Sequence, residues 1–137
     1  MPLKLENPET VAAPLGRYTH TVEVPAGSGL VFVSGQVPVA PDGSVPSTLA
    51  QQADQVYANI VAVLAAKGVP PQNIIKLTTF YVETDDPDDS VRKARAKFLG
   101  EHRPASTAVC VRALVDPRWK IEIDAIAVMP QPQTVPV

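Results

Sequence analysis

The stretch Trp119-Lys120-Ile121-Glu122-Ile123-Asp124-Ala125-Ile126-Ala127-Val128 alternates in the manner of a β-strand that places one face in a core. One face is wholly apolar and consists of Trp119, Ile121, Ile123, Ala125 and Ala127. The other begins with Lys120, Glu122 and Asp124 and ends with Ile126 and Val128. A carboxylate on such a half-covered strand needs a partner, a water or a chemical role. Glu122 is therefore either half of an ion pair with a neighbouring strand or an acid or base in a pocket.

The composition is that of an ordinary globular protein, with 45% apolar and 19% charged residues in 137. This length predicts one domain spanning residues 1–137. The net charge of −2, without a basic cluster, argues against nucleic-acid or anionic-membrane partners. The single cysteine fits a reducing compartment, and residues 1–8 lack the features of a signal peptide. The apolar run at residues 60–66 is too short to cross a bilayer, so a cytoplasmic protein is expected.

Motifs for metal or cofactor chemistry are missing from the sequence. His20 and His102 are far apart and have no cysteine or acid at ligand spacing beside them. Neither a Gly-x-Gly-x-x-Gly or Walker-type loop nor a Gly-x-Ser-x-Gly elbow is present. We therefore expect no metal and no organic cofactor, although counting residues does not exclude a Ser-His-Asp arrangement.

Hydrophobic periodicity predicts the order strand, strand, helix, strand, helix, strand, strand. The strands are expected at residues 18–24, 30–34, 73–83, 107–112 and 119–128. The first helix, at 48–67, starts at a capping box formed by Thr48 and Gln51, and Gly68 ends it. The second starts at an Asx cap, Asp86, with Pro87 at its first position, and ends at Gly100. Its basic residues are interpreted as a solvated helix face: Arg92, Lys93, Arg95 and Lys97.

The connection at 113–118 is short, so the last two strands are predicted to pair antiparallel. Two helices cannot cover both faces of the sheet, which predicts an α+β fold with helices on one face only. The open face is expected to carry Glu122, Asp124, Ile126 and Val128 on the last strand. From the adjoining strand it is expected to carry Ser106, Ala108, Cys110 and Arg112. Such a face is too apolar to stay in water, and this indicates a homo-oligomer.

Several segments resemble the reactive intermediate deaminase family, also called the Rid or YjgF family, over about residues 18–128. The resembling segments are Tyr18-Thr19-His20, Val31-Phe32-Val33-Ser34-Gly35-Gln36-Val37-Pro38, residues 51–68, residues 75–82, Arg103-Pro104-Ala105-Ser106 and residues 121–128. The resemblance implies a chorismate-mutase-like α+β fold with a mixed sheet, assembled as a homotrimer with a cleft at each subunit interface. Active members of the family hydrolyse imines or enamines, such as 2-aminoacrylate, to ketoacids and ammonia without a cofactor.

The resemblance also implies roles for individual residues. Tyr18 matches a tyrosine that lines the cleft, and Ser34 and Gly35 match backbone that packs against the substrate. Glu122 matches the acid that positions or activates water. A carboxylate suits this role, because imine hydrolysis needs a proton delivered to nitrogen and a water held for attack.

One segment departs from the family pattern. Where deaminases of the family have Pro-Ala-Arg-Ser, with an arginine that clamps the substrate carboxylate, this chain has Pro104-Ala105-Ser106-Thr107. Ala108 likewise replaces a cysteine whose backbone amide serves the site. Loss of a guanidinium removes charge-assisted bonds worth roughly 1.5–3 kcal/mol. The sequence therefore predicts a substrate other than 2-aminoacrylate.

Two other arginines could supply the missing charge. Arg103 precedes the strand that carries Ser106, and Arg17 adjoins Tyr18. Either could reach into the cleft or serve only at the surface or an interface. The alternative to a hydrolase is a non-catalytic trimer that binds a metabolite or another protein.

Overall fold

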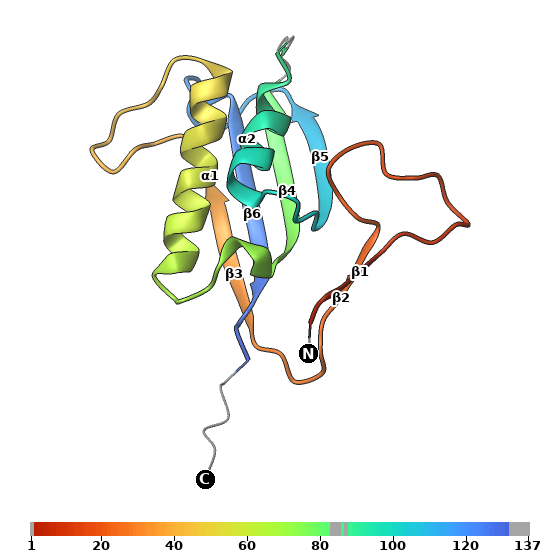
Figure 1. Ribbon diagram of the computed structural model, residues 1–137. Helices are drawn as coiled ribbons and strands as arrows, with labels where there is room; N and C mark the ends of the chain where they lie inside the picture. The colour runs from red at the N-terminus through yellow and green to blue at the C-terminus, as the bar shows by residue number, and fades with distance from the viewer. Residues whose placement is uncertain (1, 83–85, 87, 132–137) are drawn as a thin grey trace.

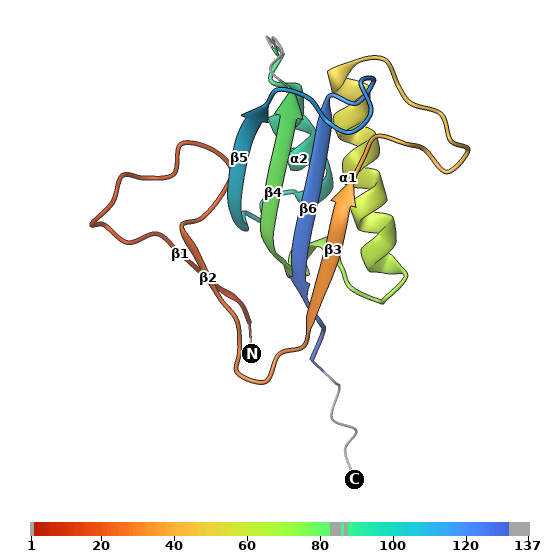
Figure 2. The ribbon, with the colours of Figure 1, turned by 180° about the vertical axis from the view of Figure 1, so that it is seen from behind.

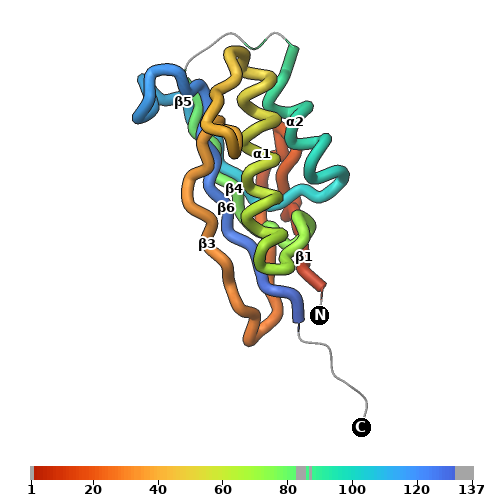
Figure 3. Tube along the Cα trace, turned by 90° about the vertical axis from the view of Figure 1, so that its left-hand side faces the viewer, coloured from red at the N-terminus to blue at the C-terminus, as the bar shows by residue number. Residues whose placement is uncertain are grey.

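The computed structural model describes residues 2–82, 86 and 88–131. In chain order the elements are β1 (Lys4–Glu6), β2 (Thr21–Glu23), β3 (Leu30–Gln36), α1 (Leu49–Ala65), the 3-10 turn η1 (Pro71–Asn73), β4 (Ile74–Val82), α2 (Ser90–Leu99), β5 (Ala105–Val111) and β6 (Ile121–Val128). Both helices lie on one face of the main sheet (Figure 1), and the side view separates the strands from the helices (Figure 3). The predicted α+β architecture with a mixed sheet is confirmed.

The main sheet has the strand order β3-β6-β4-β5. β6 runs antiparallel to both β3 and β4, whereas β4 and β5 are parallel. The predicted antiparallel pairing of the last two strands is therefore wrong. The helical crossover through α2 returns the chain in the direction of β4, so β5 pairs parallel to β4. Residues 112–120 then lead from β5 past the end of β4, so that β6 lies between β4 and β3 (Figure 2).

This pairing decides which face of the sheet β5 presents to the helices. Ser106 is the partner of Leu77, and Ala108 is the partner of Thr79. Leu77 and Thr79 are fully buried beneath the helices. Ser106, Ala108 and the next alternate residue of β5 therefore point to the helix side, not to the open face that carries Glu122. The predicted common face is wrong, because a strand's register follows its true partner.

The open face carries charged and apolar groups side by side. Glu122 pairs with Phe80, and Asp124 pairs with Thr78. The exposed large apolar side chains on this face include Leu30, Phe32 and Val109. Phe32 is 72% exposed, which leaves a hydrophobic patch on this side of the single chain.

Helix α1 supplies much of the core beneath the sheet. The side chain of Thr48 accepts a hydrogen bond from the Gln51 backbone at 3.2 Å, as the predicted cap requires. Gly68 has a φ of +70°, which suits a glycine that ends a helix. The buried stripe is Leu49, Gln52, Ala53, Val56, Tyr57, Ile60 and Leu64. Val63 of the same helix is 40% exposed.

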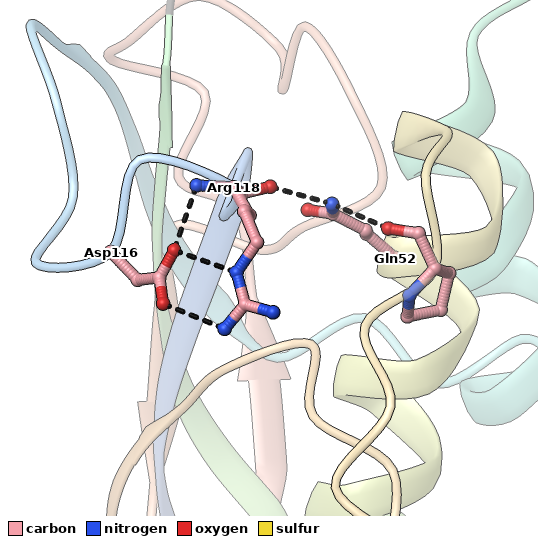
Figure 4. A network of polar contacts seen from close by, with 4 residues as sticks. Gln52, Asp116 and Arg118 are labelled. Carbon is pink, nitrogen blue, oxygen red and sulfur yellow. Dashed lines mark hydrogen bonds and ion pairs between the residues drawn. The ribbon is translucent and has the colours of Figure 1, made fainter.

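A buried amide on α1 holds the connection that leads into β6 (Figure 4). Gln52 Nε2 donates to the carbonyls of Pro46 and Arg118 at 2.8 and 2.9 Å. Gln52 Oε1 accepts from the Lys120 backbone at 2.7 Å. An ion pair of 2.8 Å between Arg118 and Asp116 closes the same turn. These bonds fix the start of β6 and hence the position of Glu122 two residues further on.

Helix α2 is held at its start by an aspartate. Asp86 accepts hydrogen bonds from the backbones of Ser90 at 2.9 Å and Val91 at 3.4 Å. Burial acts to raise the pKa of Asp86, but these hydrogen bonds outweigh it and lower the pKa below its ordinary value. The predicted start of this helix is too early, because α2 begins at Ser90 with Asp89 at the cap position. Pro87, predicted at the first helical position, and residue 83, the predicted strand end, lie outside the described residues.

The N-terminal segment forms a small sheet of its own and is bonded to the start of β5. β1 pairs antiparallel with β2 as a separate two-stranded sheet, and β2 covers only part of the strand expected at 18–24. The backbone of Thr19 donates to Pro104 at 3.3 Å, and its hydroxyl donates to the carbonyl of Arg103 at 2.9 Å. These bonds bring Tyr18 next to the start of β5. In the described part of the chain, no helix combines the length and apolarity needed to cross a bilayer.

Candidate functional site

The predicted acid Glu122 lies against Gly35 of the neighbouring strand β3. A Cβ placed on Gly35 would contact Glu122 Oε2 and lie 2.9 Å from its carboxyl carbon. The register between β3 and β6 shifts between Val33 and Gln36, and this irregularity includes Gly35. Only a residue without a side chain leaves the carboxylate where it is. A larger residue would therefore displace the Glu122 carboxylate, and the reason for glycine here is this close approach and not backbone conformation.

Glu122 is half-buried and is not committed to an ion pair among the described residues. The ion-pair alternative for this acid therefore has no support in the described part of the chain. Ser34, which precedes Gly35, is exposed. Together Ser34, Gly35 and Glu122 form one group of predicted site residues, and it lies on β3 and β6.

A pocket of about 730 Å³ contains the other predicted residues. Tyr18, Ser106 and Ala108 line it, together with residues of β4 and the start of α2. The hydroxyl of Tyr18 accepts a hydrogen bond from the Leu15 backbone at 3.2 Å, which fixes the loop at the pocket wall. The volume lies within the range of ordinary small-molecule sites.

Arg95 also lines this pocket, although a solvated helix face was predicted for it from the sequence. That interpretation is wrong, because Arg95 is only 9% exposed. Its Nε donates to the Tyr57 hydroxyl at 3.0 Å, Nη1 to the carbonyl of Arg17 at 3.3 Å and Nη2 to Thr79 Oγ1 at 3.5 Å. All three acceptors are neutral. The guanidinium lies over Thr79, whose strand partner is Ala108.

A signal for this burial was present in the sequence. Val91, Arg95 and Leu99 follow one another at intervals of four residues and so share one side of the helix. Leu99 is fully buried and Val91 packs against the core. The arginine sits in the middle of an apolar stripe, which is not where a solvated cation is expected.

Two tyrosines near the pocket have raised pKa values. Burial raises the pKa of Tyr57, and the adjacent Arg95 guanidinium partly offsets this. A hydrogen bond with the Cys110 thiol raises the pKa of Tyr81, and burial adds to the effect. Both groups remain neutral hydroxyls near neutral pH, so neither supplies a negative charge to Arg95.

The remaining charged groups of the pocket lie near its rim. Arg92 forms an ion pair of 3.3 Å with Asp89, and both side chains are exposed. Arg17 lines the pocket and donates to the carbonyl of Gly100 at 3.4 Å. Arg103, the other arginine considered from the sequence, is exposed. Among the described residues, no cluster of three or more histidine, cysteine or acidic side chains could hold a metal ion.

The predicted site residues therefore lie in two groups within one chain. Tyr18, Ser106 and Ala108 line the pocket, and Ser34, Gly35 and Glu122 are assembled by β3 and β6. The β4 register puts Ser106 and Glu122 on opposite faces of the sheet. A single protomer does not bring the two groups together.

Comparison with known proteins identifies the family. The family model described as endoribonuclease L-PSP matches residues 9–129. A relative from Escherichia coli named 2-iminobutanoate/2-iminopropanoate deaminase is 35% identical over 123 residues, covering 88% of this chain and 93% of the relative. Protein DfrA from Myxococcus xanthus is 37% identical over 117 residues, covering 83% and 86%.

Solved structures of similar proteins support the same family. A Rid-family protein of unknown function from Yersinia pestis superposes with a TM-score of 0.83 at 29% identity, covering 94% of this chain and all of that chain. The structure of E. coli TdcF with bound serine gives a TM-score of 0.66 at 32% identity, covering 93% and 99%. The chain belongs to the Rid family.

Proposed function

We propose that this protein hydrolyses a reactive imine or enamine in clefts formed between the protomers of a homotrimer. The observation that carries the proposal is the Glu122 carboxylate, which is half-buried against Gly35 and free of ion pairs among the described residues. The relative named as an iminobutanoate and iminopropanoate deaminase supports this reaction class.

The reaction consumes one water. Water adds to the carbon of the C=N bond and the nitrogen gains protons, so that ammonia leaves and a C=O group remains. Glu122 would accept a proton from the attacking water and deliver it to nitrogen, which a single carboxylate can do in turn. An enamine first takes a proton on carbon to become the imine, and the same acid is suited to supply it.

Assembly would bring the two groups of site residues together. The open face carries Glu122 and also the exposed apolar side chains Phe32 and Val109, so contact with another copy would bury both. In this arrangement one protomer contributes Ser34, Gly35 and Glu122. A neighbour contributes the pocket wall with Tyr18, Ser106 and Ala108. The exposed apolar patch supports this assembly.

Ser106 bears on the choice of substrate. A hydroxyl offers one neutral donor where a guanidinium would offer a charged, bidentate one. We propose that the chain belongs to a branch in which the carboxylate clamp at this position is lost. 2-Aminoacrylate, whose carboxylate that clamp would hold, would then be a poor substrate.

The test is a Glu122→Gln substitution with Asp124→Asn as the matched control. Asp124 lies on the same strand and the same face, two residues along. Imines would be generated in the assay by an amino-acid dehydratase, and ketoacid release would be followed. We expect Glu122→Gln to lose about 100-fold or more in rate and the control to stay near wild type. A wild type without turnover, or an equally active Glu122→Gln, would favour a trimer that only binds a metabolite.

A further inference from the structure

We infer that Arg95 is the anion-binding residue of the pocket and that the substrate carries a negatively charged group which this guanidinium holds. The inference deepens the proposed function, on which the identity of the ligand as a substrate rests. Arg95 is a buried cation whose hydrogen-bond acceptors are all neutral. A guanidinium removed from water normally finds an anion, because its desolvation is costly otherwise.

Arg95 has no such partner among the described residues. Its three hydrogen bonds go to a phenol, a backbone carbonyl and a threonine hydroxyl. The ion pairs found in the described part of the chain join other residues. A guanidinium has five N–H donors, so two remain for a ligand in the pocket that Arg95 lines.

The charge of the lining also favours an anion. The described residues around the pocket include three arginines, Arg17, Arg92 and Arg95, against two aspartates, Asp86 and Asp89. Asp89 is paired with Arg92 at the rim, and Asp86 accepts hydrogen bonds from the start of α2. Neither aspartate forms an ion pair with Arg95. Among the described lining residues, the positive charge of Arg95 is therefore not balanced by an ion pair.

The three hydrogen bonds also hold the guanidinium in place before a ligand arrives. They tie it to α1 through Tyr57, to β4 through Thr79 and to the N-terminal loop through the carbonyl of Arg17. A cation fixed in this way loses little side-chain freedom on binding. Two of its anchors belong to the packed helix and sheet, so its position depends little on the loop.

Position and volume narrow the ligand class. Arg95 lies over Thr79, the strand partner of Ala108, and is more deeply buried than the half-buried Ser106. The pocket, at about 730 Å³, is far larger than a three-carbon acid needs. The anionic group would sit at Arg95, and the reacting carbon would lie toward the mouth. This geometry fits a carboxylate-bearing imine larger than 2-aminoacrylate.

The experiment measures binding of an unreactive product, so it does not depend on turnover. The affinities of the full-length protein for 2-oxobutanoate and for the neutral 2-oxobutanamide would be determined by calorimetry. Variants would be Arg95→Gln and Arg95→Lys, with Lys93→Gln as the matched control, since Lys93 is exposed on the same helix. We expect Arg95→Gln to weaken binding of the carboxylate by about tenfold or more and leave the amide unchanged. Arg95→Lys should retain part of the preference, and Lys93→Gln all of it.

A second substitution should restore the preference for the carboxylate that Arg95→Gln removes. Ser106 lines the same pocket, so Ser106→Arg in the Arg95→Gln background should restore preference for the carboxylate over the amide. Equal loss of both ligands in a folded Arg95→Gln, or no loss, would overturn the inference. If Arg95→Gln does not fold, the wild type decides, because a failure to prefer the carboxylate excludes an anion site. Glu122→Gln should keep the preference for 2-oxobutanoate over 2-oxobutanamide even where it abolishes turnover, which separates this inference from the proposed hydrolysis.

Discussion

The two faces of the main sheet differ in the sign of the charge that each leaves without an ion-pair partner among the described residues. The helix-covered face buries the Arg95 cation, whose hydrogen bonds go to neutral oxygens. The open face presents the Glu122 anion, which packs on a glycine. Among the described residues these two charges do not meet each other or another partner of opposite sign. An unpaired charge in a half-buried or buried place is costly, and this cost supports the proposal that each face contributes to a site.

The two charges also stand on different kinds of element. Arg95 stands on a helix and is fixed by bonds to α1 and β4, whereas Glu122 stands on a central strand whose start is fixed by Gln52. Both supports are rigid elements of the core. Residues on such elements hold their geometry better than residues on loops.

The largest effect is expected from adding a charge to the open face. Phe32→Glu would put a carboxylate where the proposed assembly would bury an apolar ring, so the proposed trimer should not form and turnover should be lost. Sedimentation velocity would report the mass. Val63→Glu, on an exposed part of α1, is the control and should remain assembled. A monomeric wild type would contradict the proposed trimer, since the open face would then have no partner copy.

A smaller loss is expected when Glu122 is displaced without being changed. In Gly35→Ala the new Cβ would collide with the carboxylate, and a shift near 1 Å in a catalytic group costs on the order of 100-fold in rate. Steady-state ketoacid release and a thermal melt would be compared. Gly29→Ala is the control, because its Cβ would meet only the flexible Met129 side chain at 3.3 Å. Wild-type turnover in Gly35→Ala would show that the position of Glu122 is not important.

The smallest effect concerns the support of Arg95 on the helix side. Asp86→Ala removes the acceptor at the start of α2 and should lower the free energy of unfolding by about 1 kcal/mol at pH 7. Because the pKa of Asp86 is lowered in the folded state, its contribution is present above pH 3.8. It fades as the pH falls below 3.8 through the folded-state pKa, so the two proteins should converge there.

Denaturant unfolding at several pH values measures this. Asp88→Ala, which changes an exposed acid two residues away, should match wild type throughout. A difference between Asp86→Ala and wild type that grows toward acid would have the wrong sign for a carboxylate whose folded-state pKa is lowered.

Local features of the fold were predictable because they depend on nearby residues. Thr48 and Gln51 cap α1 as their spacing requires, and Gly68 takes the positive φ expected at a helix end. A sheet covered on one side was predicted because two helices cannot cover both of its faces. The approach of Glu122 to Gly35 was not visible in the sequence, since it depends on an irregular register between distant strands.

By itself, the sequence determined the α+β class, the cap and end of α1, the family and the choice of Glu122 as the acid of interest. Tertiary structure alone decided that β5 pairs with β4, and this pairing turns Ser106 toward the helices and away from Glu122. It also decided that Arg95 is buried. The reason is physical: caps and periodicity act within a few residues, whereas strand pairing and burial depend on contacts between segments far apart in the chain.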